Sequence, residues 1–231
     1  MPQQAVDGIA NQIFIGCPWK TLRKKYERAI DSLKRRYPIS FVIVGRDDGQ
    51  DAEDLLAIIK GRLLTSSYAI FDATGGNANV SLEYGFAEAN EIPRALYLCT
   101  HAASTKASKD SAIISDLAGK RRNHYTQEQS LQKLLGQAAK NHKYTQRFER
   151  FIVRDMRSLT KTLKTRTRRL ALKIIHTMDG QRSIRRADVV QTLLADPAGY
   201  KRSEIDLRIS RLHRAELIRG EPDRYSTVSI A

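Results

Sequence analysis

The chain has 231 residues, 41% of them hydrophobic, which is enough for one large domain or two small ones with a buried core. Its 40 Lys and Arg residues against 25 Asp and Glu residues give a formal charge of +15, which suggests a polyanionic partner, usually nucleic acid. Two cysteines without metal-ligand spacing argue against a disulfide framework. The absence of a signal peptide and of any apolar run of about 18 residues predicts a cytoplasmic protein without a membrane partner.

Short apolar runs alternate with amphipathic segments over the first part of the chain. We expect strands at 13–16, 41–44, 68–71 and 94–99, and helices at 21–36, 52–64 and 80–90. This alternation predicts an α/β fold with a doubly wound parallel sheet. In a flavodoxin-like strand order, the first and third strands lie on either side of the switch point, where ligands bind.

The rest of the chain has a different pattern. Residues 100–112 are small and polar, so we expect a loop over the crevice or a disordered segment, and residues 126–164 are expected to be helical and basic. Further helices are predicted at 168–178, 184–194 and 203–217, followed by a hairpin over 218–230 with its turn at Gly220–Asp223. Three helices and a terminal hairpin resemble a winged helix-turn-helix domain. We therefore divide the chain into an α/β domain (1–135), a basic helical linker (136–165) and a winged helix-turn-helix-like domain (166–231).

Two acidic residues flank the turn after the third predicted strand. Asp72 ends that strand, and Glu83 lies about one turn into the next helix. A capping box does not explain Glu83, because Asn79, taken as the cap, precedes it by four residues rather than three. The dipole of the helix would also favour an acid in its first turn, so this simpler role of Glu83 remains open.

The segment Asn-Ala-Asn-Val-Ser-Leu-Glu-Tyr-Gly-Phe-Ala, residues 77–87, resembles the signature of nucleoside 2-deoxyribosyltransferase-like proteins and related TIR-like domains. The opening strand and loop Ile13-Phe-Ile-Gly-Cys-Pro-Trp19 and the segment Ser115–Tyr125 resemble other parts of these families, so the resemblance covers about residues 10–135. It implies that Glu83 acts at the anomeric carbon of a nucleoside or of NAD. It also implies a role as a bacterial antiviral defence effector that depletes nucleotides.

The first-strand loop, Gly16, Cys17, Pro18 and Trp19, is expected to face Asp72 and Glu83 across one crevice. Trp19 could stack on a base or be a core anchor, and Asp72 could bind the ligand or cap the following turn. Further candidate ligand contacts are Arg46, Asn77, Asn79 and Ser81. Arg46 is more simply a surface partner of Asp47 and Asp48, while Asn77 and Asn79 could be turn and cap residues only.

The basic excess is stronger near the C-terminus. Residues 1–150 hold 22 basic and 16 acidic side chains, whereas residues 151–231 hold 18 and 9. The candidate nucleic-acid contacts are Arg202, Ser203, Arg208 and Arg211 on the expected recognition helix, with Arg219 and Arg224 beside the wing. The alternative is a dimerisation or partner-docking module with a solvated basic face.

These observations predict a nucleotide-binding protein that cleaves the N-glycosidic bond of NAD or a nucleoside or nucleotide, with Glu83 and Asp72 as catalytic residues. No cofactor or metal is expected, and NAD or a nucleotide would be the substrate or ligand. One alternative is a nucleotide-sensing, DNA-binding transcriptional regulator without catalysis, and another is a structural nucleic-acid-binding protein. The sequence leaves open whether the chain forms a homo-oligomer.

Overall fold

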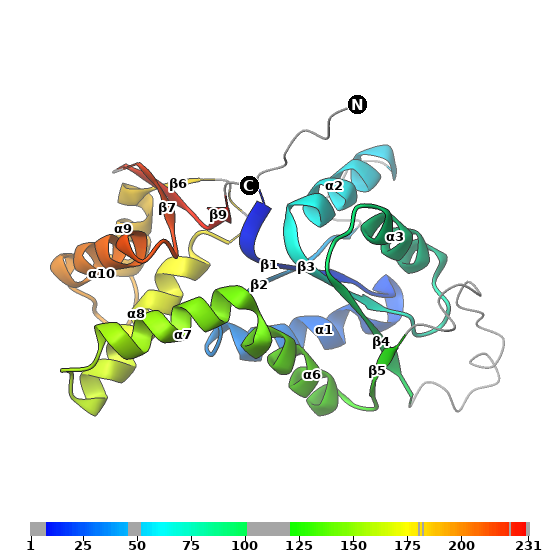
Figure 1. The fold of residues 1–231 in the computed structure, drawn as a ribbon, viewed down its shortest axis with the longest axis horizontal. Helices are drawn as coiled ribbons and strands as arrows, with labels where there is room; N and C mark the ends of the chain where they lie inside the picture. Colours follow the sequence, from blue (N-terminus) through cyan, green and yellow to red (C-terminus); the bar gives the residue numbers. More distant parts are fainter. Residues whose placement is uncertain are drawn as a thin grey trace.

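The fold was analysed in a computed structural model, which describes residues 8–45, 52–100, 121–179, 181, 183–221 and 223–229. A parallel sheet with helices on both faces forms one half of the molecule, and a group of helices with a small antiparallel sheet forms the other (Figure 1). The first half, residues 8–141, is called the α/β unit below, and the second, residues 161–226, the C-terminal unit.

The central sheet has the predicted doubly wound arrangement. Its strands are β1 (Gly8–Gly16), β2 (Ser40–Ile43), β3 (Ser66–Asp72), β4 (Arg94–Cys99) and β5 (Arg122–Tyr125). They are parallel and lie in the order β2-β1-β3-β4-β5, which is the flavodoxin-like order. The switch point therefore lies between β1 and β3, as the sequence predicts.

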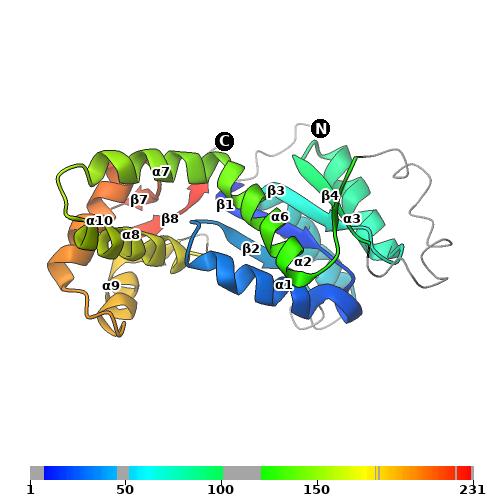
Figure 2. The same ribbon diagram turned by 90° about the horizontal axis from the view of Figure 1, so that it is seen from below.

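Helices cover both faces of this sheet (Figure 2). They are α1 (Trp19–Lys34), α2 (Ala52–Thr65), α3 (Ala78–Ala89) and α6 (Glu128–Asn141). Ile13 and Ile15 of β1 belong to the core that includes residues of α1 and α6, whereas Phe14 belongs to a second core with residues of α2 and α3. This alternation follows from the two-residue period of a strand, and burial on both faces makes the strands almost continuously apolar.

Two local predictions need correction. Strand β5 was not predicted, because its sequence Arg122-Asn-His-Tyr125 is polar and has no apolar alternation. Helix α3 begins two residues earlier than expected, and its N-cap is Asn77 rather than Asn79. The Asn77 side chain accepts hydrogen bonds from the backbone N–H groups of Asn79 and Val80, at 3.0 and 3.3 Å.

The region expected to be a basic linker consists of packed helices. Helix α6 contacts α1, and α7 (Lys143–Asp155) buries Tyr144, Phe148 and Phe151. The charge and amphipathic pattern of this region predicted its helices, but it could not show that they pack into the core. The expected loop at 100–112 lies outside the described residues, apart from Thr100.

The C-terminal unit combines three helices with a three-stranded antiparallel sheet. Its elements are α8 (Lys161–His176), β6 (Ile184–Arg185), α9 (Arg186–Leu194), α10 (Arg202–Arg214), β7 (Arg219–Glu221) and β8 (Arg224–Ser226). The strand order is β6-β8-β7. The expected hairpin is present but shorter than predicted, because β9 (Val228–Ser229) leaves it and pairs antiparallel with the start of β1.

The two units share one hydrophobic core, which runs from Ile13 in β1 to Tyr225 in β8. Polar contacts add to the junction: the Tyr144 hydroxyl donates to the Leu217 carbonyl at 2.7 Å, and His176 Nε2 lies 2.9 Å from the Tyr37 carbonyl oxygen. The continuous core, together with one buried and one partly buried hydrogen bond, makes this junction a fixed interface rather than a flexible linker.

Candidate functional site

The candidate site lies at the carboxyl ends of β1 and β3, on either side of the switch point. Gly16 ends β1 and Asp72 ends β3, while α3 follows β3 after a short turn at 73–77. Ligands of open α/β sheets bind in this position, because the connections of the first and third strands diverge there.

Glu83 points toward the end of β1. A Cβ atom added to Gly16 would lie 2.5 Å from Glu83 Oε2 and 2.6 Å from a ring carbon of Phe71, so the carboxylate approaches the Gly16 backbone closely and glycine avoids crowding both groups. Oε2 is buried, and no group of the described residues forms a hydrogen bond with it. Burial raises the pKa of Glu83 from 4.5 to about 7. A carboxyl group with a shifted pKa and no hydrogen bond to one oxygen, beside a switch point, is a candidate catalytic group.

Asp72 is held differently, and this corrects its expected role as a direct ligand contact. The residue is fully buried, and its Oδ2 accepts hydrogen bonds from the Tyr26 and Tyr125 hydroxyls, at 2.7 and 2.6 Å. Its Oδ1 accepts from the backbone N–H of Thr74 at 3.0 Å, which is the turn-capping role left open by the sequence. Asp72 therefore positions the two tyrosines and the turn.

Sequence reasoning missed Tyr26 and Tyr125 as site residues. Tyr26 comes from α1 and Tyr125 from the end of β5, and burial and the charge of Asp72 raise the pKa of both phenols. Both side chains remain protonated and keep donating to Asp72. The available signal was that a buried tyrosine needs a partner for its hydroxyl, and Asp72 is a suitable acceptor.

Cys17 and Pro18 form the loop after β1. The Cys17 thiol is largely buried, and its pKa is raised by burial first and then by the negative charges of Asp72 and Glu83. Both carboxylates therefore act electrostatically on the same loop residue. The raised pKa keeps Cys17 protonated, so it is a poor nucleophile. Pro18 is the N-cap of α1, and its carbonyl accepts from the Leu22 backbone N–H at 2.9 Å.

Trp19 is an anchor between α1 and the end of β2. A Cβ atom at Gly45 would overlap the Trp19 ring, so the indole packs directly on the Gly45 backbone. The Arg23 guanidinium lies 3.8 Å from the centroid of the same ring. Of the two roles left open by the sequence, this packing matches the anchor, and a base could stack on that face only if Arg23 moved.

The remaining predicted ligand contacts are dispersed. Asn77 is occupied as the N-cap of α3, Asn79 is exposed in its first turn, and the Ser81 hydroxyl donates to the Asn77 carbonyl at 3.2 Å. Asn77 therefore has the cap role left open by the sequence, whereas Asn79 is not the cap. Arg46 lies outside the described residues, as do Asp47 and Asp48.

The residues predicted to contact nucleic acid differ in their exposure. Arg208 is buried and ion-paired with Asp155 of α7, and Arg211 Nη1 also contacts Asp155, at 2.7 Å. This placement contradicts the prediction for Arg208, because a buried guanidinium bound to a carboxylate cannot reach a phosphate. Arg211 is partly exposed, whereas Arg202, Ser203 and Arg224 are exposed and Arg219 is half-buried.

No cluster of three or more His, Cys, Asp or Glu side chains suited to a metal ion occurs in the described part of the chain. Among the described helices, none is both long and apolar enough to cross a membrane. Comparison of the chain with protein families, with curated proteins and with solved structures finds no match.

Proposed function

We propose that the region at the carboxyl ends of β1 and β3, around Glu83, binds NAD or a nucleoside or nucleotide and cleaves its N-glycosidic bond. The observation that carries this proposal is the Glu83 carboxylate, which lies against Gly16 with a buried oxygen and a pKa of about 7. Cleavage of the bond develops positive charge on the sugar ring, and a carboxylate beside C1′ can stabilise this charge or trap it covalently.

The surrounding residues support this chemistry. Asp72 fixes Tyr26 of α1 and Tyr125 of β5 by hydrogen bonds, so it ties two elements to the end of β3 beside Glu83. Such support keeps a reacting group in place without itself touching the substrate. In this proposal Glu83 is the catalytic residue and Asp72 is a positioning residue.

The test compares the wild-type protein with Glu83→Gln during incubation with NAD and a panel of nucleosides, with the products separated by chromatography. We expect the variant to bind the substrate but to release the base at least about a hundredfold more slowly. Glu88→Gln is the matched control, because Glu88 lies on the same helix and pairs with Arg94 at 2.6 Å. Turnover of Glu83→Gln at the wild-type rate would exclude Glu83 as the catalytic carboxylate.

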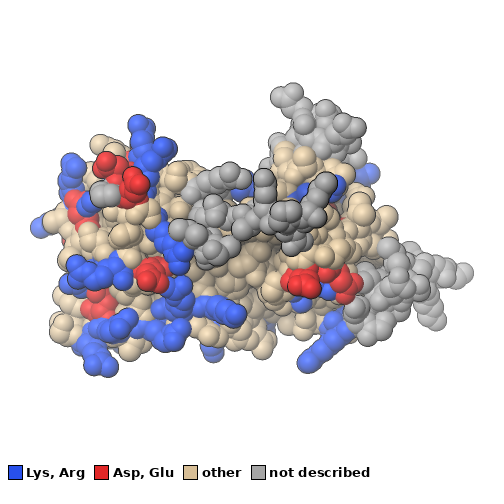
Figure 3. Space-filling view, turned by 45° about the horizontal axis from the view of Figure 1, so that its top comes forward, with Lys and Arg blue, Asp and Glu red and all other residues tan. Residues whose placement is uncertain are grey.

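We further propose that the C-terminal unit is a winged helix-turn-helix domain that binds nucleic acid. Its three helices and the strand order β6-β8-β7 support this fold, with α10 as the recognition helix and β7–β8 as the wing. Lys and Arg side chains gather over this unit, at the left of Figure 3, with acidic side chains among them. Arg185, Arg202 and Arg224 line one hollow of about 440 Å³ beside α10.

Nucleic-acid binding can be tested with Arg202→Ala combined with Arg224→Ala. Gel shifts with duplex DNA and RNA should weaken, and the salt dependence should become less steep by about one phosphate contact per arginine. The control is Arg154→Ala combined with Arg157→Ala, at and just beyond the end of α7. Equal binding by both double variants would favour a protein-docking role for the wing.

A second candidate function is a nucleotide-sensing regulator that does not turn its ligand over. The shared core between the two units favours it, because ligand binding in a rigidly joined unit can alter its neighbour. Nucleotide binding by wild-type protein without base release, together with a nucleotide-dependent gel shift, would select this function.

A further inference from the structure

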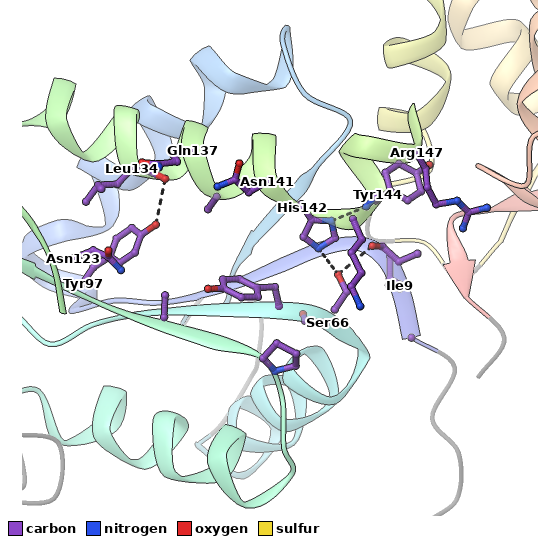
Figure 4. Close-up of a pocket in the computed structure, with 18 residues that line it drawn as sticks. Ile9, Ser66, Tyr97, Asn123, Leu134, Gln137, Asn141, His142, Tyr144 and Arg147 are labelled. Atoms are coloured by element: carbon purple, nitrogen blue, oxygen red, sulfur yellow. Dashed lines mark hydrogen bonds between the residues drawn. The ribbon is translucent and has the colours of Figure 1, made fainter. Parts of the chain in front are cut away.

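A second hollow lies at the opposite end of the sheet from Glu83. It has a volume of about 760 Å³ and lies between the amino-terminal halves of β1, β3 and β4 and the helices α6 and α7 (Figure 4). This volume falls within the usual range for small-molecule sites, which is about 300–1,000 Å³.

The floor and one wall of this groove are mainly apolar. Tyr68 and Ala95 come from the sheet, and Leu134 and Ala138 come from α6. The Tyr97 hydroxyl donates to the Leu134 carbonyl at 3.3 Å, which fixes its ring against the helix (Figure 4). Tyr97 is buried beneath this surface, while the partly buried Tyr68 ring and the aliphatic side chains form a wall suited to an aromatic or aliphatic body.

The most conspicuous polar pair in the groove is structural. Ser67 Oγ lies 3.0 Å from His142 Nε2, a distance that would also suit a nucleophile and its base. His142 Nδ1, however, accepts the backbone N–H of Tyr144 at 3.2 Å, and burial followed by the charge of Lys143 lowers the pKa of His142 to about 4. The neutral ring therefore carries its proton on Nε2 and donates to Ser67. It cannot remove the Ser67 proton, so Ser67 and His142 do not form a nucleophile–base pair.

The charge of the groove is positive and comes from one end. Lys143 and Arg147 line it from the first turns of α7, and no Asp or Glu is among the described residues that line it. Arg147 also contacts Glu216, with Nη2 3.4 Å from its carboxylate and 3.3 Å from its carbonyl oxygen, at an exposed position. Exposed pairs of this kind are weak, so the guanidinium can also bind an anion in the groove.

We propose that this groove is a binding site for a small organic anion, with an apolar body against Tyr68 and Leu134 and an acidic group at Lys143 and Arg147. The amide side chains of Gln137 and Asn141 lie on α6 along the same groove and supply further hydrogen bonds to the ligand (Figure 4). An apolar wall, a few amides and a cationic end together suit an organic anion. A neutral hydrocarbon would leave the amides and the cationic groups without a partner.

The groove also borders the junction between the two units. Tyr144 lines it and donates to the Leu217 carbonyl, Arg147 reaches Glu216, and Gly8 and Ile9 pair with β9. A ligand at this position contacts the residues that hold the C-terminal unit. Its binding therefore slows amide hydrogen exchange in residues 216–229 as well as in α7.

The experiment uses full-length protein and the fluorescent probe anilinonaphthalene sulfonate, which has an aromatic body and one negative charge. We expect saturable binding with one probe per chain, roughly tenfold weaker binding by Arg147→Ala, and loss of binding by Ala138→Trp, which fills the groove. Arg150→Ala is the matched control, because Arg150 lies on α7 and lines a different hollow. It should bind the probe as the wild type does.

Two outcomes would overturn the proposal. One is equal probe binding by the wild type, Arg147→Ala and Arg150→Ala. The other is equally tight binding of the uncharged analogue phenylnaphthylamine, which keeps the aromatic body but lacks the sulfonate. The analogue needs no variant, so it decides the question even if Ala138→Trp does not fold. Slower exchange of residues 216–229 on probe binding supports contact with the junction, and unchanged exchange there overturns that part.

Discussion

Arg208 in the C-terminal unit is buried, and Glu83 in the α/β unit is half-buried with one buried carboxylate oxygen, but the two charged groups differ in their partners. Arg208 in the C-terminal unit is paired with Asp155, which also contacts Arg211. Glu83 in the α/β unit has a buried oxygen to which no described group forms a hydrogen bond, and its pKa rises accordingly. A buried charge with a partner stabilises a particular packing, whereas one without a partner destabilises the fold and is retained for another reason. The difference separates a structural ion pair from a candidate reactive group.

The largest expected effect is on the structural side of this comparison. Asp155→Ala should lower the free energy of unfolding by about 3–5 kcal/mol, because it leaves Arg208 buried without its counter-charge. Urea unfolding followed by circular dichroism measures this loss. Asp31→Ala removes an exposed partner of Lys34 on α1 and should change stability by less than about 0.5 kcal/mol. Similar losses of unfolding free energy in the two variants would show that the buried Arg208–Asp155 pair stabilises the fold no more than an exposed pair does.

Glu83→Gln should have the next largest effect, with the opposite sign. The wild-type carboxyl group has a pKa of 4.5 when exposed and about 7 when folded, so the folded state holds its proton more tightly. Stability of the wild type should therefore fall as pH rises from about 4.5 to 7, by up to roughly 3 kcal/mol. Glutamine does not titrate, so the variant does not lose stability over this pH range. It should therefore be more stable than the wild type at pH 8 and similar at pH 4.

The same titration predicts the direction of the pH–rate profile. If Glu83 acts as a carboxylate, base release should increase with pH and level off above about 7, where the group is ionised. A rate that instead falls through this range would mean that the protonated form is active, as for a general acid. Glu88→Gln should retain the wild-type profile.

Tyr26→Phe tests whether the buried Asp72 carboxylate, like the Arg208–Asp155 pair, is stabilised by its partners. The change removes one of two phenol donors to a fully buried carboxylate, so we expect a loss of about 1.5–3 kcal/mol in unfolding free energy. Tyr37→Phe is the control, because its half-buried ring lies beside Arg36. If Tyr26→Phe lowers the free energy of unfolding no more than the control does, the hydrogen bond from Tyr26 does not stabilise the Asp72 carboxylate.

Asn77→Ala should have the smallest effect on stability, and it tests whether Asn77 contacts the ligand. Loss of the N-cap should reduce stability by about 1 kcal/mol, while base release should change little, because the side chain is bound to its own helix. Thermal unfolding and the chromatographic assay measure the two quantities. A rate loss as large as that of Glu83→Gln would instead make Asn77 a ligand contact.

Local sequence patterns predicted much of the α/β unit. The strand–helix alternation and the position of Glu83 beside the switch point follow from apolar runs, turn residues and chain order. Strand β5 was missed because Arg122-Asn-His-Tyr125 pairs by its backbone at a sheet edge without an apolar pattern. Pairing of this kind depends on a neighbour that lies far away in the sequence.

Side-chain partners across the fold could not be predicted. Asp72 meets Tyr26 and Tyr125 only after α1 and β5 have been placed beside β3. Similarly, helical spacing on α10 shows which residues share a face with Arg208 but not that this face meets Asp155 of α7. The choice between a structural and a functional role was therefore decided by tertiary contacts.

The pairing of β9 with β1 has a consequence for how the chain folds. Ile9 and Val228 pair although they lie near opposite ends of the described chain. This contact therefore closes a loop that contains nearly every other element. Contacts of such long sequence separation form late, because the entropy of closing the loop is lost before they contribute. During synthesis, the edge of β1 at Gly8 and Ile9 that pairs with β9 stays open until β9 has emerged. The same strand pair that fastens the two units is then the last step of their assembly.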